Sequence, residues 1–227
     1  MRFGPLDELH MSVPIRVIFI ALFLLLATAG RAQPVDALFD PLDLSDSIPV
    51  SIVDMTGMAS AGVDDSQLAQ WALQDWSRAI DGRLRFHIVA EESEALILVR
   101  FVPPGGGQYG EMLALEANGR RGAAVFVRPD TEALGPVIAA RAAEDSLFRE
   151  TIVYLTCVHE LGHALGLAHT AEYADIMYAF GYGGDIEEYF HRYRRRLETR
   201  DDIREQSALS AADRQRVRAL YSDGNER

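Results

Sequence analysis

The segment HELGHALGLAH, residues 159–169, constrains the fold of this 227-residue chain more than any other feature of its sequence. His159 and His163 are four residues apart, which on a helix is about 400° of rotation, so both rings face the same side. Two imidazoles one turn apart can bind a single Zn²⁺ ion. The chain must therefore form a helix here and leave one side of it accessible to a metal ion.

The neighbouring residues indicate a metal site that performs chemistry. Gly166 lies one turn beyond His163, and glycine can adopt the left-handed conformation that ends a helix and turns the chain back. His169 can then supply a third nitrogen, which leaves the fourth zinc position to water, as in catalytic zinc sites. Glu160 lies about 100° around the helix from His159, where it can reach such a water without replacing it. We therefore predict the metal ligands His159, His163 and His169 and the catalytic residue Glu160.

Composition excludes several other functions. The formal net charge of −12 argues against a nucleic-acid-binding protein, which would normally present a basic face. The sequence contains no lysine, so it lacks the residue that a P-loop or a Schiff-base enzyme requires. Cys157 is the only cysteine, which excludes an internal disulfide and a cysteine-based zinc cluster. We expect Cys157 to be a small core residue.

Residues 1–32 have the features of a secretory signal peptide. Arg16 precedes the apolar run 17–27, and small residues follow it, with cleavage expected after Ala29 or Ala32. The run is short for a membrane span, so we expect a secreted, periplasmic or extracellular protein with no stable span after processing. A retained signal anchor is the alternative. Residues 33–47 are rich in Asp and Pro and are predicted to be an extended linker.

Residues 48–222 predict one α/β (α+β) domain, because a strand, a helix and further strands are followed by helices. Periodicity and β-branched residues predict strands at 48–55, 84–90, 95–102, 112–116 and 123–127. Helices are expected at 64–80, from Asp145 or Ser146 to about 165, at 186–205 and at 209–222, with 130–145 partly helical. The helix at 186–205 is expected to be mostly solvated. Its aromatic residues either dock it to the domain or pack over the rim of the cleft.

The zinc segment resembles the long signature of the metzincin metallopeptidases, which also requires a later methionine turn. The sequence ADIMY provides that turn, with Met177 eight residues after His169. Thr170 and the terminal LSAADRQRVRALYS are most similar to the matrixin branch. The resemblance implies a twisted, mostly parallel five-stranded sheet with three main helices. It also implies that residues 112–116 form an antiparallel edge strand beside the cleft, and that Met177 packs beneath the metal.

The sequence departs from the matrixin pattern in ways that change the expected site. Matrixins commonly hold a second, structural zinc, but residues 103–127 contain no histidine or aspartate, and Leu115 and Val125 stand at apparent ligand positions. One catalytic zinc is therefore expected, and calcium is left open because carbonyls and scattered acids can bind it. The sequence MYAFGY lacks the usual proline and tyrosine after the methionine, and 181–207 is longer than the matrixin connection.

These observations give the hypothesis of a secreted zinc-dependent metalloendopeptidase, monomeric and acting on polypeptides. Zinc activates a water molecule, and Glu160 accepts its proton as the general base. One alternative is a zinc-dependent amidase acting on non-protein substrates, which a short closed pocket would favour. Another is a non-catalytic zinc-holding binding module, which would have no need of Glu160.

Overall fold

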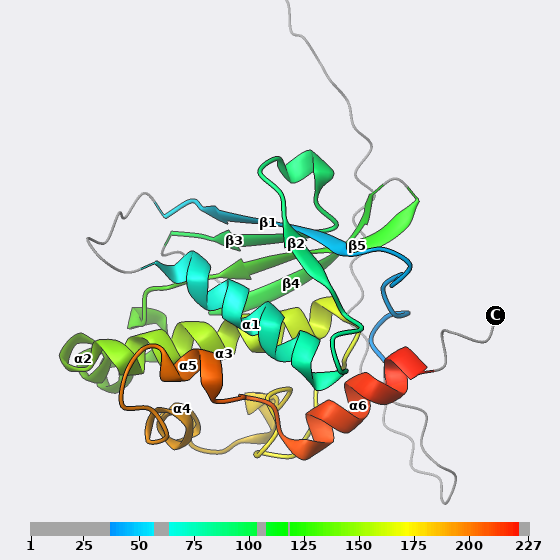
Figure 1. The fold of residues 1–227 in the computed structure, drawn as a ribbon. Coiled ribbons are helices and arrows are strands. Elements are labelled where there is room, and N and C mark those ends of the chain that lie inside the picture. The colour runs from blue at the N-terminus through cyan, green and yellow to red at the C-terminus, as the bar shows by residue number, and fades with distance from the viewer. Residues whose placement is uncertain (1–36, 57–63, 104–107, 118, 223–227) are drawn as a thin grey trace, which may run out of the picture. The chain divides into compact units, whose positions relative to one another are not determined.

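Five strands form one sheet in the computed structural model of the protein, which describes residues 37–56, 64–103, 108–117 and 119–222. The strands are β1 (Ile48–Asp54), β2 (Phe86–Ile88), β3 (Ile97–Phe101), β4 (Gly110–Ala117) and β5 (Arg120–Val127), in the order β2-β1-β3-β5-β4. All neighbours are parallel except β4 and β5 (Figure 1). The predicted sheet with its antiparallel edge strand is confirmed. The expected signal peptide, residues 1–32, lies outside the described residues.

The two strands of the hairpin are longer than the sequence predicted. Antiparallel pairing continues from Gly110 opposite Val127 to Ala117 opposite Arg120, so the apolar segments 112–116 and 123–127 are only the central parts of β4 and β5. Backbone hydrogen bonding extends a strand beyond its apolar residues, and the apolar pattern does not report this extension. The extension places Gly110 at the start of the edge strand.

Three long helices account for the main helical layer: α1 (Asp65–Ala79), α3 (Ser146–Ala164) and α6 (Ala211–Ser222). Helices α1 and α3 lie along the same face of the sheet (Figure 1). The side chains of Asp64 and Asp145 cap α1 and α3 by accepting hydrogen bonds from Gln67 N and Phe148 N. At the start of α6, Ser210 and Asp213 exchange hydrogen bonds in a capping-box arrangement.

Three shorter helices also occur in the described part of the chain: α2 (Pro136–Glu144), α4 (Ile186–Arg194) and α5 (Asp202–Glu205). The expectation of one mostly solvated helix at 186–205 is wrong. Helix α4 ends at Arg194, and the side chain of Asp202 accepts the N–H groups of Glu198 and Thr199, which holds the chain in a turn. The turn buries Leu197 and Ile203 in the core, together with the aromatic side chains Tyr189, Phe190 and Tyr193.

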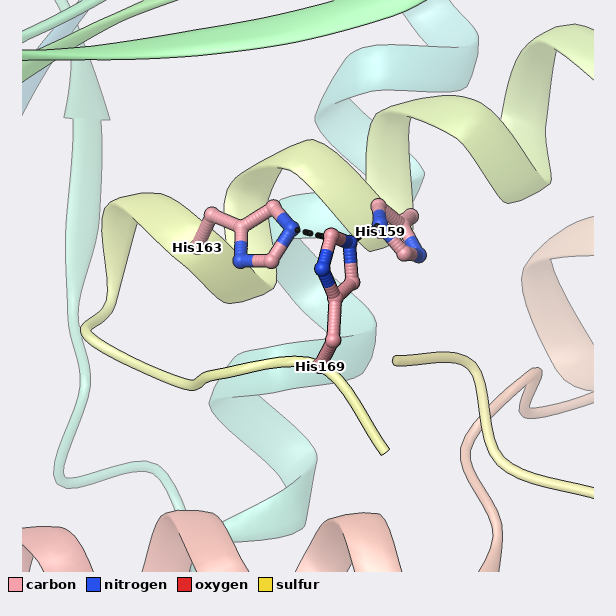
Figure 2. Close-up of side chains that lie close together, drawn as sticks. All are labelled: His159, His163 and His169. Carbon is pink, nitrogen blue, oxygen red and sulfur yellow. Dashed lines mark hydrogen bonds between the residues drawn. The ribbon is translucent and has the colours of Figure 1, made fainter. Parts of the chain in front are cut away.

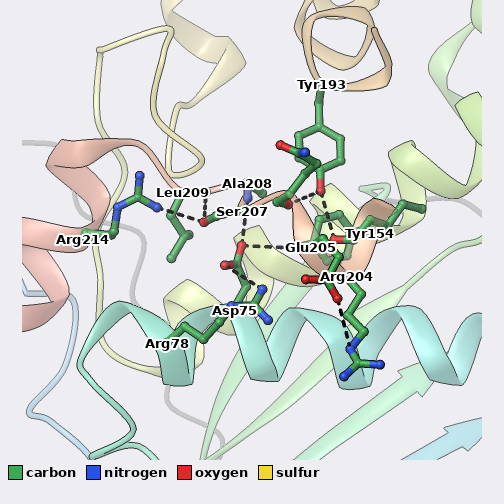
Figure 3. A network of polar contacts seen from close by, with 12 residues as sticks. Asp75, Arg78, Tyr154, Tyr193, Arg204, Glu205, Ser207, Ala208, Leu209 and Arg214 are labelled. Atoms are coloured by element: carbon green, nitrogen blue, oxygen red, sulfur yellow. Dashed lines mark hydrogen bonds and ion pairs between the residues drawn. The ribbon is translucent and has the colours of Figure 1, made fainter. Parts of the chain in front are cut away.

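A buried polar network joins these helices (Figure 3). Asp75 of α1 is 1% exposed, and its Oδ2 atom accepts hydrogen bonds from the Tyr154 hydroxyl at 3.1 Å and the Ala208 N–H at 2.8 Å. The Tyr193 hydroxyl of α4 donates to Gln206 O at 2.5 Å. One carboxylate therefore connects α1 and α3 to the segment that leads into α6.

Residues 37–43, which we call the N-terminal strap, pack on the domain although their composition predicted a linker. Ala37 forms an antiparallel bridge with Leu167, and Leu38 N donates to Gly166 O at 2.7 Å. Leu42 is 3% exposed, so burial of an apolar side chain helps to hold this Asp- and Pro-rich segment against the domain. The strap therefore contacts the loop that follows α3.

Candidate metal centre

Three histidine side chains converge at the end of α3 (Figure 2). His159 and His163 project from the last two turns of the helix, and His169 approaches from the loop beyond it. The Nε2 atom of His169 lies 3.2 Å from Nε2 of His159 and 3.0 Å from Nε2 of His163. Two nitrogens bound tetrahedrally to zinc at about 2.0–2.1 Å would be roughly 3.3 Å apart, so these separations match a shared ion.

Hydrogen bonds to the backbone fix which ring nitrogens are free to bind a metal. Nδ1 of His159 lies 2.6 Å from Ile176 O, and Nδ1 of His163 lies 2.8 Å from Leu167 O. A carbonyl oxygen can only accept, so both Nδ1 atoms carry the proton and both Nε2 lone pairs face the third ring. Lone pairs this close repel one another unless a cation lies between them. The donor set therefore suits Zn²⁺.

Burial keeps the two helical rings uncharged. Desolvation lowers the pKa of His159 to about 4, and desolvation together with the neighbouring histidines lowers the pKa of His163 to about 3. The pKa of the more exposed His169 is also lowered, mainly by desolvation. Neutral imidazoles are the form that binds metal, so the site is ready for an ion at neutral pH.

The loop that carries His169 is held from several sides. Gly166 has a φ of +106°, the left-handed conformation expected of it, and a Cβ at this residue would lie 2.8 Å from Phe39 O of the strap. The strap donates to Gly166 O through Leu38, and the Arg216 guanidinium of α6 donates to Ala168 O at 2.7 Å. The backbone just before His169 is therefore tied to the first and last described segments of the domain.

Met177 lies beneath the histidines and is fully buried. A Cβ at Gly162 would lie 2.4 Å from its sulfur, so the methionine packs directly against the bare backbone of α3. Thr170 N donates to Met177 O at 2.8 Å, and Asp213 of α6 accepts the Ile176 N–H at 2.8 Å. The methionine turn thus supports the helix from below, as the sequence led us to expect.

Glu160 is 7% exposed and lines the same cavity as His159 and His169. Desolvation, with a smaller contribution from Glu111, raises the pKa of its carboxyl to about 8. A cation held by the histidines would favour the charged form. The structure therefore brings together all four residues that the sequence singled out.

The cavity has a volume of about 480 Å³, is open to solvent, and is lined by residues of β4, α3, α4 and the segment that follows the methionine turn. Its walls include Leu134, Leu155, Ile186 and Phe190, so the space beside Glu160 is largely apolar. The Tyr178 hydroxyl donates to Gly183 O at 2.6 Å, which assigns it a structural role in the rim. Sequence reasoning missed Gly110 and Leu134, because nothing in their local sequence shows that they face the cavity.

Leu115 and Val125, which stand at the apparent ligand positions of a second zinc, lie on β4 and β5, and Val125 is fully buried. Within the described ranges, His159, His163 and His169 are the one group of three or more His, Cys, Asp or Glu side chains close enough to share a metal ion. Cys157 is free and buried, as predicted, and burial raises the pKa of its thiol.

Comparison with known proteins agrees with this geometry. The family model described as Matrixin matches residues 51–222, from the first strand of the sheet to the end of α6. No curated protein matches the chain.

Proposed function

The chain belongs to the matrixin family of zinc metalloendopeptidases, and from that premise we propose that it is a secreted peptidase with Glu160 as its general base. One observation carries the proposal: the three histidine rings converge, and two of them, His159 and His169, line the same cavity as Glu160 beside the edge of the sheet. His159, His163 and His169 are the proposed zinc ligands.

The proposed mechanism assigns each group of the chain a separate task. His159, His163 and His169 would hold the zinc ion, which would supply the Lewis-acid chemistry that lowers the pKa of water and polarises a carbonyl. The Glu160 carboxylate accepts a proton from the attacking water and returns it to the leaving amine. The backbone carbonyls of Ile176 and Leu167 hold the imidazoles of His159 and His163 in the tautomer that leaves Nε2 free.

The edge strand provides the proposed binding surface for the substrate. Strand β4 ends the sheet, so its outer N–H and C=O groups are available to an extended peptide. The cavity between α3 and α4 would receive the side chain next to the scissile bond. The edge strand beside this open cavity favours polypeptide substrates over the small amides of the alternative hypothesis.

Export is proposed from the sequence of residues 1–32, which has the order of charged, apolar and small residues of a signal peptide. In the described ranges, the helices are too short or too polar to cross a membrane. N-terminal sequencing of the exported protein tests this proposal. A start at Gly30 or Gln33 is expected, and an intact N-terminus held in the membrane would indicate a retained anchor.

The role of Glu160 is tested by Glu160→Gln, which keeps size and polarity but removes the base. We expect normal zinc content and a fall in peptide hydrolysis of about 10²–10⁴-fold, measured with a peptide library in the presence and absence of a chelator. Glu172→Gln makes the same change at an exposed carboxylate and should retain activity. Unchanged turnover in Glu160→Gln would reject the assignment.

A further inference from the structure

Gly110, the first residue of β4, lies directly against the Glu160 side chain. A Cβ built on Gly110 would stand 2.6 Å from Glu160 Oε1, 2.6 Å from Thr156 Cγ2 and 2.9 Å from Glu160 Cγ. Carbon atoms do not approach oxygen or carbon atoms this closely in folded proteins. The carboxyl therefore occupies space that exists only because residue 110 has no side chain.

The Glu160 carboxyl is positioned by packing rather than by polar partners. Among the described residues, no group donates a hydrogen bond to it. Thr156, one turn earlier in α3, has its rotamer fixed because its hydroxyl donates to Ile152 O at 2.8 Å. The carboxyl thus lies between a fixed methyl group and the bare backbone of the edge strand.

We propose that Gly110 is a positioning residue for Glu160, whose carboxyl reaches the reacting water only while residue 110 lacks a side chain. The inference rests on the proposed function, because it assumes that Glu160 is the general base. It also explains why β4 begins on a glycine at the point where the strand passes the active-site helix. A displacement of about 1 Å in a catalytic group can lower the rate about 10²-fold.

The stability of the fold should fall less when a methyl group is added at Gly110 than when one is added at Gly122. Gly110 does not have the positive φ seen at Gly166, so alanine can adopt its backbone conformation. The added methyl meets the end of the Glu160 side chain, which can rotate away, and the Thr156 methyl, which must shift by a small amount. At Gly122, in contrast, a Cβ would lie 2.4 Å from the backbone oxygen of Leu96, which cannot move without disturbing the sheet.

The first experiment compares Gly110→Ala with Gly122→Ala. For Gly110→Ala we expect kcat to fall about 10²-fold, while KM and zinc content stay close to those of the parent. We expect the thermal unfolding midpoint to fall less in Gly110→Ala than in Gly122→Ala. A Gly110→Ala variant with normal kcat, or one that loses zinc or unfolds at as low a temperature as Gly122→Ala, would overturn the inference.

The second experiment asks whether Gly110 acts through Glu160. Adding Gly110→Ala to Glu160→Gln should increase the loss in kcat by less than about two-fold, because the affected group is already absent. The affinity of the Glu160→Gln protein for an uncleaved fluorescent peptide should also be unaffected by Gly110→Ala. Additive losses or weaker peptide binding would instead assign Gly110 to substrate pairing along β4.

The two proposals fail in different ways. Full activity of Glu160→Gln would reject Glu160 as the base and the positioning role with it. A large loss in Glu160→Gln combined with full activity of Gly110→Ala would reject the positioning role alone.

Discussion

Replacement of Asp75 separates its role as a hydrogen-bond acceptor from its charge. The same oxygen, Oδ2, accepts from the Tyr154 hydroxyl and from the Ala208 N–H, while Oδ1 lies 3.3 Å from the half-exposed guanidinium of Arg78. An asparagine with its carbonyl oxygen at the Oδ2 position can still accept both hydrogen bonds. An alanine can accept neither.

The free energies of unfolding of the two variants should therefore differ. Asp75→Ala removes the acceptor of the buried Tyr154 hydroxyl, at about 1–3 kcal/mol, and that of the part-buried Ala208 N–H, at about 1–2 kcal/mol, which is roughly 2–5 kcal/mol in total. Asp75→Asn replaces a charged acceptor by a neutral one, which costs about 1–2 kcal/mol over two bonds. Arg78→Met, which removes only the half-exposed ion pair, should cost less than about 1 kcal/mol.

Urea unfolding of the zinc-loaded proteins measures these differences. With a slope of about 2 kcal/mol per M, the midpoint should fall by roughly 1–2.5 M for Asp75→Ala and by at most about 1 M for Asp75→Asn. Equal midpoints for the alanine and asparagine variants would show that the charge, not the acceptor, stabilises the network. A midpoint unchanged in Asp75→Ala would refute the energetic reasoning altogether.

Four further outcomes are expected. His169→Ala should lower zinc occupancy and abolish peptide hydrolysis, and full zinc content by metal analysis would remove that residue from the site. The same analysis should give one zinc per mature chain, whereas two tightly bound ions would contradict the interpretation of residues 103–127. Leu38→Pro removes the N–H that donates to Gly166 O, so zinc should be lost faster to a chelator than from the parent, while an equal rate would exclude a role for the strap. Shortening 181–207 to a tight turn should change the preference for residues after the scissile bond, because α4 contributes Phe190 to the cavity wall. An unchanged cleavage profile, or unfolding of the shortened protein, would show that the segment has only a structural role.

The parts of the site that the sequence predicted are those determined by local geometry. His159, Glu160 and His163 lie on one helix, and their arrangement follows from its period alone. The turn at Gly166 is also local, because it depends on one residue with positive φ. The edge strand was predicted because its apolar core and the family resemblance agreed.

The parts that the sequence did not predict depend on contacts between distant segments. Gly110 faces Glu160 only because of the register of β4 on β5, which no local pattern near residue 110 determines. The strap was expected to be part of a linker because residues 33–47 are rich in Asp and Pro, yet Leu42 is buried and Leu38 N donates to Gly166 O. At 186–205 the many charged residues favoured the prediction of a solvated helix, although the buried aromatic residues of α4 pack it against the domain.

The contacts that hold the loop carrying His169 have a consequence for the order in which the parts of the site form during synthesis. All three histidines leave the ribosome well before α6, but the loop that carries His169 is held by Arg216 and its neighbour Leu165 by Tyr221, both in that helix. A nascent chain therefore contains the complete ligand set before it contains the groups that hold the third ligand in place. The third ligand therefore gains these tethers only after α6 has been made and has docked on the domain.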